Sequence, residues 1–167
     1  MFFKQGRSRF RALLLISALC LSVLPATAAA ADGVINAGDT TFIMLAAALV
    51  MLMTPGLGLF YAGMVRQKNV LGTIMQSFLV LGVVSLQWVL FGYSLAFGGD
   101  IGGFVGNLDF VGLAGVGQTP GEYAGTIPHQ AFMVFQGMFA IITPALITGA
   151  LAERVKFSSF LLFIVLW

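Results

Sequence analysis

Three long apolar stretches, separated by short polar segments, dominate the pattern of this chain. The stretches Thr41–Met64, Leu71–Phe97 and Pro128–Leu151 contain no Asp, Glu, Lys or Arg. About 20 apolar residues in a helix cross the hydrocarbon core of a bilayer, which is roughly 30 Å thick. The pattern therefore predicts transmembrane helices and an all-α fold, a polytopic membrane helical bundle.

A fourth apolar stretch begins at Phe157 and still continues at the last residue, Trp167. At a rise of about 1.5 Å per residue, a helix of this length reaches only about half way across a bilayer. We therefore expect this chain to be the N-terminal part of a longer membrane protein.

The composition agrees with a membrane protein and excludes two other classes. Hydrophobic residues make up 59% of the chain and charged residues only 8%, whereas soluble domains carry roughly 25% charged residues. So little charge could not keep a monomer soluble in water, and so much apolar surface excludes a disordered chain. Four of the eight basic residues precede Ala12, so the rest of the chain has no basic surface that would fit a nucleic acid.

The first 31 residues resemble a secretory signal peptide, and we assign residues 32–167 to the membrane domain. A basic segment, Met1–Arg11, precedes an apolar core, Ala12–Leu24, that is short for a membrane span. Several A-x-A sites follow, and we expect cleavage within Ala28–Ala31. An uncleaved anchor helix is the alternative.

The basic residues predict which side of the membrane each loop occupies. Arg66 and Lys68 lie between the first two apolar stretches, and Arg154 and Lys156 follow the third. The glycine-rich connection between the second and third stretches contains acidic but no basic residues, and we expect it to be irregular. Because cytoplasmic loops collect Lys and Arg, we expect a multi-pass protein of the inner (plasma) membrane with its mature N-terminus outside.

The apolar stretches offer little reactive chemistry. Cys20, the only cysteine, would be removed when the signal peptide is cleaved. His129, the only histidine, has no Cys or carboxylate at the spacing of metal ligands. We expect His129 to cap its helix or to line the membrane interface. No metal or cofactor is expected, and an enzyme is the least favoured function because no carboxylate pair or Ser/His/Asp set lies in any span.

Prolines and phenylalanines distinguish two of the predicted helices. Pro55 removes one backbone hydrogen bond, so we expect a kink in the first helix just before it. Phe132, Phe135 and Phe139 recur on one face of the third helix. Their spacing alone fits packing or lipid contact. If that face lined a pore, the rings would form a dry constriction that attracts a cation but excludes the water of its hydration shell.

Four longer motifs resemble the ammonium transporter (Amt/Rh) family. They occur in the order and topology of that family, and the resemblance covers the chain from about Asn36 to Trp167. The motifs are Met53–Leu71 (MTPGLGLFYAGMVRQKNVL), Trp88–Gly98 (WVLFGYSLAFG), Phe135–Thr143 (FQGMFAIIT) and Gly149–Ser158 (GALAERVKFS).

The resemblance implies a fold and a function. Members have eleven transmembrane helices and form homotrimers with one pore per subunit, so this chain would hold the N-terminal three and a half helices. It implies that ammonium or ammonia crosses the lipid bilayer through a phenylalanine-gated hydrophobic pore. Regulation by a PII-type signalling protein at the inner face is a further expectation from the family.

The resemblance also assigns substrate-pathway residues. Phe135 and Phe139 match the outer recruitment ring and the adjoining gate ring, and Gln136 in the same motif is counted with them. Tyr61 matches a position near the inner pore mouth. The paired conduit histidines of the family are not matched by His129, so we expect residues 1–167 alone not to conduct.

Glu153 and Arg154 resemble the family's polar pair at the inner edge, and we expect them to anchor helix ends. Two alternatives to a transporter remain open from the sequence. One is an ammonium sensor, in which such a membrane domain is fused to a signalling domain. The other is an unrelated small membrane subunit without a pore.

Overall fold

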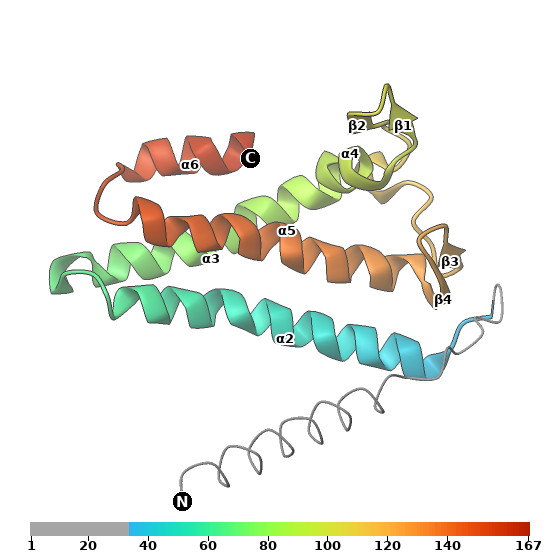
Figure 1. Cartoon of the computed structure of the whole chain (residues 1–167), viewed down its shortest axis with the longest axis horizontal. Coiled ribbons are helices and arrows are strands. Elements are labelled where there is room, and N and C mark those ends of the chain that lie inside the picture. Colours follow the sequence, from blue (N-terminus) through green and yellow to red (C-terminus); the bar gives the residue numbers. More distant parts are fainter. Residues whose placement is uncertain (1–33) are drawn as a thin grey trace, which may run out of the picture. The chain divides into compact units, whose positions relative to one another are not determined.

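The computed structural model describes residues 34–167. The signal peptide predicted at residues 1–31, with its cleavage sites, lies outside the described residues. Within them, neighbouring helices run side by side in alternating directions (Figure 1). The helices are α2 (Ala37–Ala62), α3 (Val70–Gln87), α4 (Tyr93–Phe97), α5 (His129–Leu151) and α6 (Phe157–Leu166).

Within residues 34–167, three helical segments are long and apolar enough to cross a membrane. They are Ala37–Ala62, Gln67–Phe97 and His129–Leu151, and they confirm the predicted helical bundle. The second of them is not regular throughout, because a π-helical turn, Trp88–Gly92, joins α3 to α4. Pro55 lies inside the continuous helix α2, and the kink expected there remains a prediction.

The first helix begins earlier than the hydrophobic pattern predicts because a side chain caps it. The Asn36 side-chain oxygen accepts hydrogen bonds from the backbone N–H groups of Gly38 (2.8 Å) and Asp39 (3.2 Å). Such a cap satisfies N–H groups that have no partner within the helix. The polar residues before Thr41 therefore belong to α2.

The loops at one end of the bundle hold the four basic residues of the membrane domain. Arg66 and Lys68 lie between α2 and α3, and Arg154 and Lys156 lie between α5 and α6. We call this the basic end; it is on the left in Figure 1. The grouping agrees with the charge pattern, whereas the compartment it faces remains a prediction.

The opposite, glycine-rich end contains more regular structure than expected. Two short antiparallel hairpins and a 3-10 turn, Val111–Leu113, occupy the connection between α4 and α5. The turn of the first hairpin uses Gly102 and Gly103 with φ of 65° and 79°, a conformation that favours glycine. The strands are β1 (Asp100–Ile101), β2 (Val105–Gly106), β3 (Pro120–Gly121) and β4 (Ala124–Pro128).

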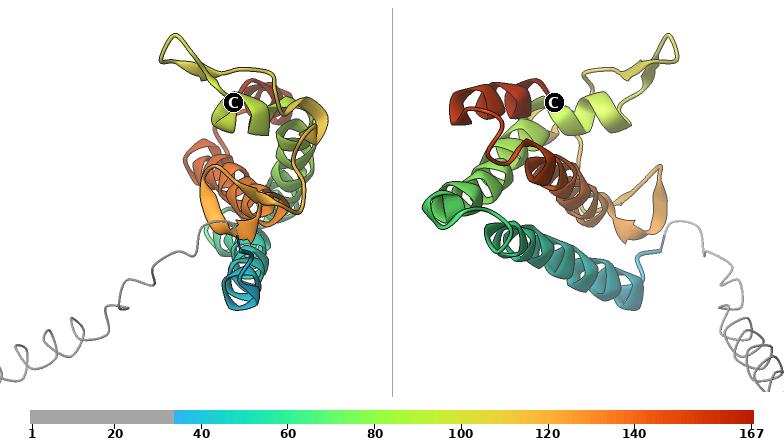
Figure 2. Two further views of the ribbon diagram at one scale, coloured as in Figure 1. Left: turned by 90° about the vertical axis from the view of Figure 1, so that its right-hand side faces the viewer. Right: turned by 60° about the vertical axis from the view of Figure 1, so that its left-hand side comes forward.

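One apolar core holds α3, α5 and α6 together, and α6 lies on the far side of α3 and α5 from α2 (Figure 2). Its buried residues are Val80, Val84, Ile141, Ala145, Phe160 and Ile164. Because α5 contributes Ile141 and Ala145, which lie four residues apart on one side of this helix, the opposite side of α5 remains free for other contacts.

Candidate functional site: the phenylalanine face of α5

Phe135 and Phe139 contact each other on the side of α5 that faces away from the core. Their ring centroids lie 5.1 Å apart, with the ring planes at 72°. Phe139 is 43% exposed and Phe135 is partly buried. Residues two apart on an α-helix point to nearly opposite sides, so Gly137 and Ile141, which are buried, place the two rings on the outward side.

Phe132 does not share the environment of the other two phenylalanines, although it follows the same spacing. Its ring lies edge-on to Phe97 at 5.2 Å and stacks on Tyr123 at 5.9 Å. The stripe predicted from the sequence therefore divides into two parts. Phe132 packs against α4 and the second hairpin, and Phe135 and Phe139 form a separate pair.

Gln136 lies beside this pair and is partly buried. One residue further along a helix turns the side chain by about 100°. Gln136 therefore borders the phenylalanine face without lying in its centre. Its part in a substrate pathway remains a prediction.

An apolar groove of about 310 Å³ extends the phenylalanine face toward the basic end. Ile142 and Leu146 line it from α5, and helical spacing puts both on the same side of α5 as Phe139. The remaining lining residues come from α2 and include Phe60. The pair of rings is thus followed, along the same side of α5, by a groove whose lining within the described residues contains no charged side chain.

Tyr61 holds α2 against α5 near the basic end. Its hydroxyl donates a hydrogen bond to the Leu146 backbone carbonyl at 3.0 Å. Its ring covers Gly149, where an added Cβ would lie 2.6 Å from ring carbons. The structure therefore shows a helix-packing contact for Tyr61, and the predicted position near a pore mouth remains a prediction.

His129, the first residue of α5, is buried among other side chains, and its predicted place at the membrane interface remains a prediction. Its Nε2 lies 2.5 Å from the Tyr93 hydroxyl, and the two residues are 8% and 0% exposed. Phe110 meets the imidazole edge-on at 5.2 Å. Gly121 of β3 covers the other side so closely that a Cβ there would stand 2.9 Å from the ring. Tyr93, Phe110 and the second hairpin together therefore enclose the histidine.

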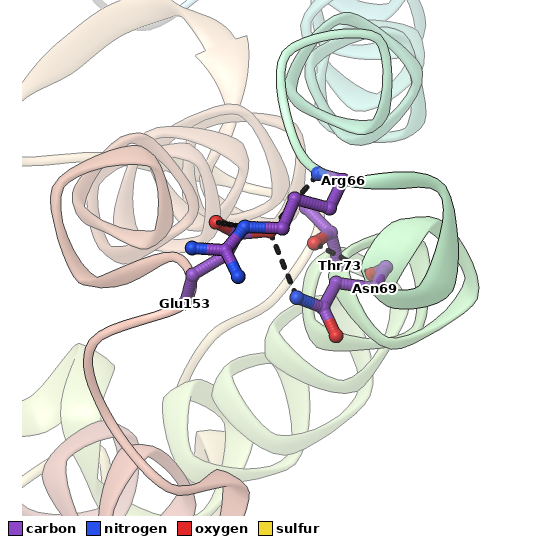
Figure 3. A network of polar contacts seen from close by, with 4 residues as sticks. All are labelled: Arg66, Asn69, Thr73 and Glu153. Atoms are coloured by element: carbon purple, nitrogen blue, oxygen red, sulfur yellow. Dashed lines mark hydrogen bonds and ion pairs between the residues drawn. The ribbon is translucent and has the colours of Figure 1, made fainter.

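Glu153 joins the two loops of the basic end (Figure 3). Its carboxylate accepts hydrogen bonds from the Arg66 backbone N–H at 2.9 Å and the Asn69 side-chain amide at 2.8 Å. It also pairs with the Arg66 guanidinium at 3.4 Å. The predicted anchoring role of Glu153 is confirmed, and its partner is Arg66, from the distant loop.

These contacts favour the charged form of Glu153. The hydrogen bond from Asn69, then that from the Arg66 N–H and the positive charges of Arg66 and Lys68, hold the pKa of this carboxyl below its ordinary value. The Glu153 backbone has φ of 62°, a left-handed conformation that is unfavourable for residues with a Cβ. The side-chain contacts stabilise a loop conformation that the backbone alone would disfavour.

Among residues 34–167, no group of three or more His, Cys, Asp and Glu side chains is arranged to hold a metal ion. Buried side chains of the candidate site are instead aromatic or aliphatic. What the described part of the chain offers is a shaped apolar surface with two aromatic rings at one end.

Comparisons with known proteins identify relatives of this chain. A model of the Ammonium Transporter Family matches residues 41–167. The ammonium transporter of Bacillus subtilis is 58% identical over 132 residues, which are 78% of this chain and 32% of the relative. The putative ammonium transporter of Methanothermobacter thermautotrophicus is 51% identical over 135 residues, 80% of this chain and 33% of the relative.

Solved structures of two yeast proteins have a similar fold. Mep2 of Candida albicans has a TM-score of 0.69 at 34% identity and covers 80% of this chain, which matches 29% of Mep2. Mep2 of Saccharomyces cerevisiae has a TM-score of 0.68, also at 34% identity, with 80% of this chain and 31% of Mep2 covered. The chain thus spans about a third of the length of the relatives it matches.

Proposed function

Because the chain belongs to the ammonium transporter family, we propose that the complete protein moves ammonium or ammonia across a membrane. The phenylalanine face of α5 would form part of the path. The unrelated membrane subunit that the sequence left open is excluded by the family. The observation that supports the path is the Phe135–Phe139 contact, outside the core and in line with the apolar groove.

The proposed chemistry of this face follows from its residues. A cation is attracted to the face of an aromatic ring, so the two rings favour ammonium over an uncharged solute of the same size. Passing between apolar walls requires the loss of hydration, which is costly for a charged ion. The groove lined by Ile142, Leu146 and Phe60 therefore favours uncharged ammonia over any hydrated ion.

The remaining expectations from the family are proposed in the same way. Family membership supports a homotrimer and a PII-type partner at the basic end. The grouping of Arg66, Lys68, Arg154 and Lys156 at one end supports a cytoplasmic location for that end in an inner (plasma) membrane. Tyr61 and Gln136 are proposed to border the path rather than to contact the solute first.

The test uses the complete protein in cells that lack other ammonium carriers. Growth on low ammonium and uptake of methylammonium report flux, and potassium currents in vesicles report ion exclusion. We expect Phe135→Ala and Phe139→Ala to weaken exclusion and selectivity more than flux. Phe78→Ala is the matched control, because this ring is on another helix, α3, outside the phenylalanine face and the lining of the groove.

If both alanine variants retained normal flux and normal ion exclusion, the proposed path would be wrong. A complete protein that binds ammonium but moves none of it would favour the alternative, an ammonium sensor. Normal behaviour of Phe78→Ala is required before either result is interpreted.

A further inference from the structure

A tryptophan at the start of the π-helical turn between α3 and α4 lies against α5. Trp88 is the first residue of this turn, which extends to Gly92. A π-helical turn shifts the following side chains around the helix axis, and such turns occur frequently at functional sites. The Trp88 ring, at the start of this turn, lies against Met133 and Gly137 of the phenylalanine-bearing helix.

Trp88 contacts α5 through both a hydrogen bond and its ring. The indole N–H donates to the Met133 backbone carbonyl at 3.2 Å. The ring also lies over Gly137, so closely that an added Cβ would stand 2.9 Å from the Cδ1 and Nε1 atoms. Because real Cβ contacts are longer than this, a glycine at this position permits the approach.

A second contact lies one turn away on the same face of α5. Tyr93 pairs with His129 at 2.5 Å, and the Trp88 ring meets Tyr93 edge-on with centroids 5.6 Å apart. His129, Met133 and Gly137 are spaced by four residues and therefore lie along one helix face. The α3–α4 segment thus contacts successive turns of α5 along one line of residues, His129, Met133 and Gly137.

That line, together with the core contacts of Ile141 and Ala145 on the same side of α5, fixes the direction of the phenylalanine pair. Gly137 is two residues from both Phe135 and Phe139, so the Trp88 contact and the two rings lie on nearly opposite sides of α5. A helix held along one line cannot rotate about its own axis without breaking those contacts. Functional groups have to be held within about 10–20° of their working direction by such neighbours.

We propose that Trp88 is a positioning residue for the Phe135–Phe139 pair. By its hydrogen bond to Met133 and its contact with Gly137, it sets the rotation of α5 and thereby the selectivity of the path. The effect on selectivity rests on the proposed function. The effect on the rotation of α5 does not rest on the proposed function, so rotation and selectivity can be tested separately.

The first experiment measures rotation without measuring transport. In the complete protein, Phe139→Cys provides a thiol on the phenylalanine face, and its reaction rate with a small methanethiosulfonate reagent reports exposure. The same protein without Phe139→Cys gives the background. We expect Trp88→Ala and Gly137→Ala to change the rate by about tenfold, and Trp88→Phe to have a smaller effect. Gly82→Ala is the matched control, because no atom of residues 34–167 lies within 4 Å of the position of its added Cβ.

The second experiment measures selectivity in proteins that keep Phe139. The ratio of KM values for methylammonium and ammonium should fall by a similar factor in Trp88→Ala and Gly137→Ala. Trp88→Phe keeps a ring over Gly137 and should restore most of the native ratio. A tryptophan that only stabilised the fold would lower the protein yield and maximal flux and leave this ratio unchanged.

The two readouts separate the possible failures. An unchanged thiol reaction rate in Gly137→Ala would overturn the positioning role, even if Trp88→Ala did not fold. A changed rate with an unchanged KM ratio would overturn the link to selectivity and count against the proposed path as well. A loss of selectivity in the phenylalanine variants combined with normal Trp88 and Gly137 variants would retain the path and reject Trp88.

Discussion

The ring of Tyr61 occupies the space into which a side chain on Gly149 would extend. An added Cβ at Gly149 would lie 2.6 Å from two ring carbons and 2.9 Å from the hydroxyl oxygen. The same hydroxyl donates to the Leu146 carbonyl at 3.0 Å. Helices α2 and α5 therefore approach at the basic end because a tyrosine meets a glycine, as small residues commonly allow in membrane proteins.

This contact predicts that Gly149→Ala destabilises the complete protein. The methyl group would force Tyr61 to move and lose its hydrogen bond, and overpacking of this kind costs about 1–3 kcal/mol. Thermal unfolding in detergent measures the effect. Gly72→Ala in α3 is the control, since no atom in the described part of the chain lies within 4 Å of its added Cβ, and it should be neutral or slightly stabilising. Equal unfolding temperatures for the two variants would contradict the tight packing.

A second prediction concerns the buried hydrogen bond between Tyr93 and His129. Tyr93→Phe removes the hydroxyl and leaves the imidazole Nε2 buried without its 2.5 Å partner. An unsatisfied buried polar group costs about 1–3 kcal/mol, so the unfolding temperature should fall. Tyr123→Phe, which changes an exposed tyrosine, should have little effect. If Tyr93→Phe were as stable as the native protein, the hydrogen bond would contribute nothing to stability.

The sequence predicts the helices well because a bilayer imposes a minimum apolar length. The starts of α3 and α5 and the ends of α4 and α5 lie within a residue of the predicted boundaries. The start of α2 differs because Asn36 caps a turn of polar residues, a local effect that hydrophobicity does not record. The grouping of the four basic residues at one end also follows directly from alternating helix directions.

The contacts of the candidate site could not be predicted in the same way. Tyr93 and His129 are 36 residues apart, and they meet because a π-helical turn changes the direction of the side chains after Trp88. No local pattern signals that turn. Phe132 shares the spacing of Phe135 and Phe139, yet the second hairpin brings Tyr123 onto Phe132 alone. Periodicity predicts a shared face and does not predict what packs on it.

The Glu153 contacts predict a pH dependence of stability. The native pKa of Glu153 lies below its ordinary value of 4.5, so the unfolded chain binds this proton more readily than the folded protein does. The stabilisation is therefore fully present above about pH 4.5 and is lost as the pH falls through the lower native pKa. Glu153→Gln should lower the unfolding temperature near neutral pH, and its difference from the native protein should shrink below pH 4.5.

A matched variant separates this effect from a general loss of negative charge. Glu122→Gln removes a charge from an exposed position in the second hairpin, and its unfolding temperature should follow the native value across the pH range. A constant difference between Glu153→Gln and the native protein down to strongly acidic pH would show that the hydrogen bonds, rather than the charge, provide the stabilisation.

The membrane topology gives the prediction on which the proposed path depends. Gln67 lies in the loop of the basic end and is exposed, and Ala114 is exposed in the connection at the glycine-rich end. We choose Ala114 over the neighbouring Gly115 because Gly115 has φ of 75°, which a side chain would strain. In intact cells, an impermeant thiol reagent should label the complete protein carrying Ala114→Cys and spare the one carrying Gln67→Cys. After permeabilisation both should react, and the protein without an added cysteine gives the background. Labelling of both variants from outside would place the start of α3 and the end of α4 in the same compartment. The segment Gln67–Phe97 would then not cross the bilayer, and a path along α5 across the bilayer could not exist.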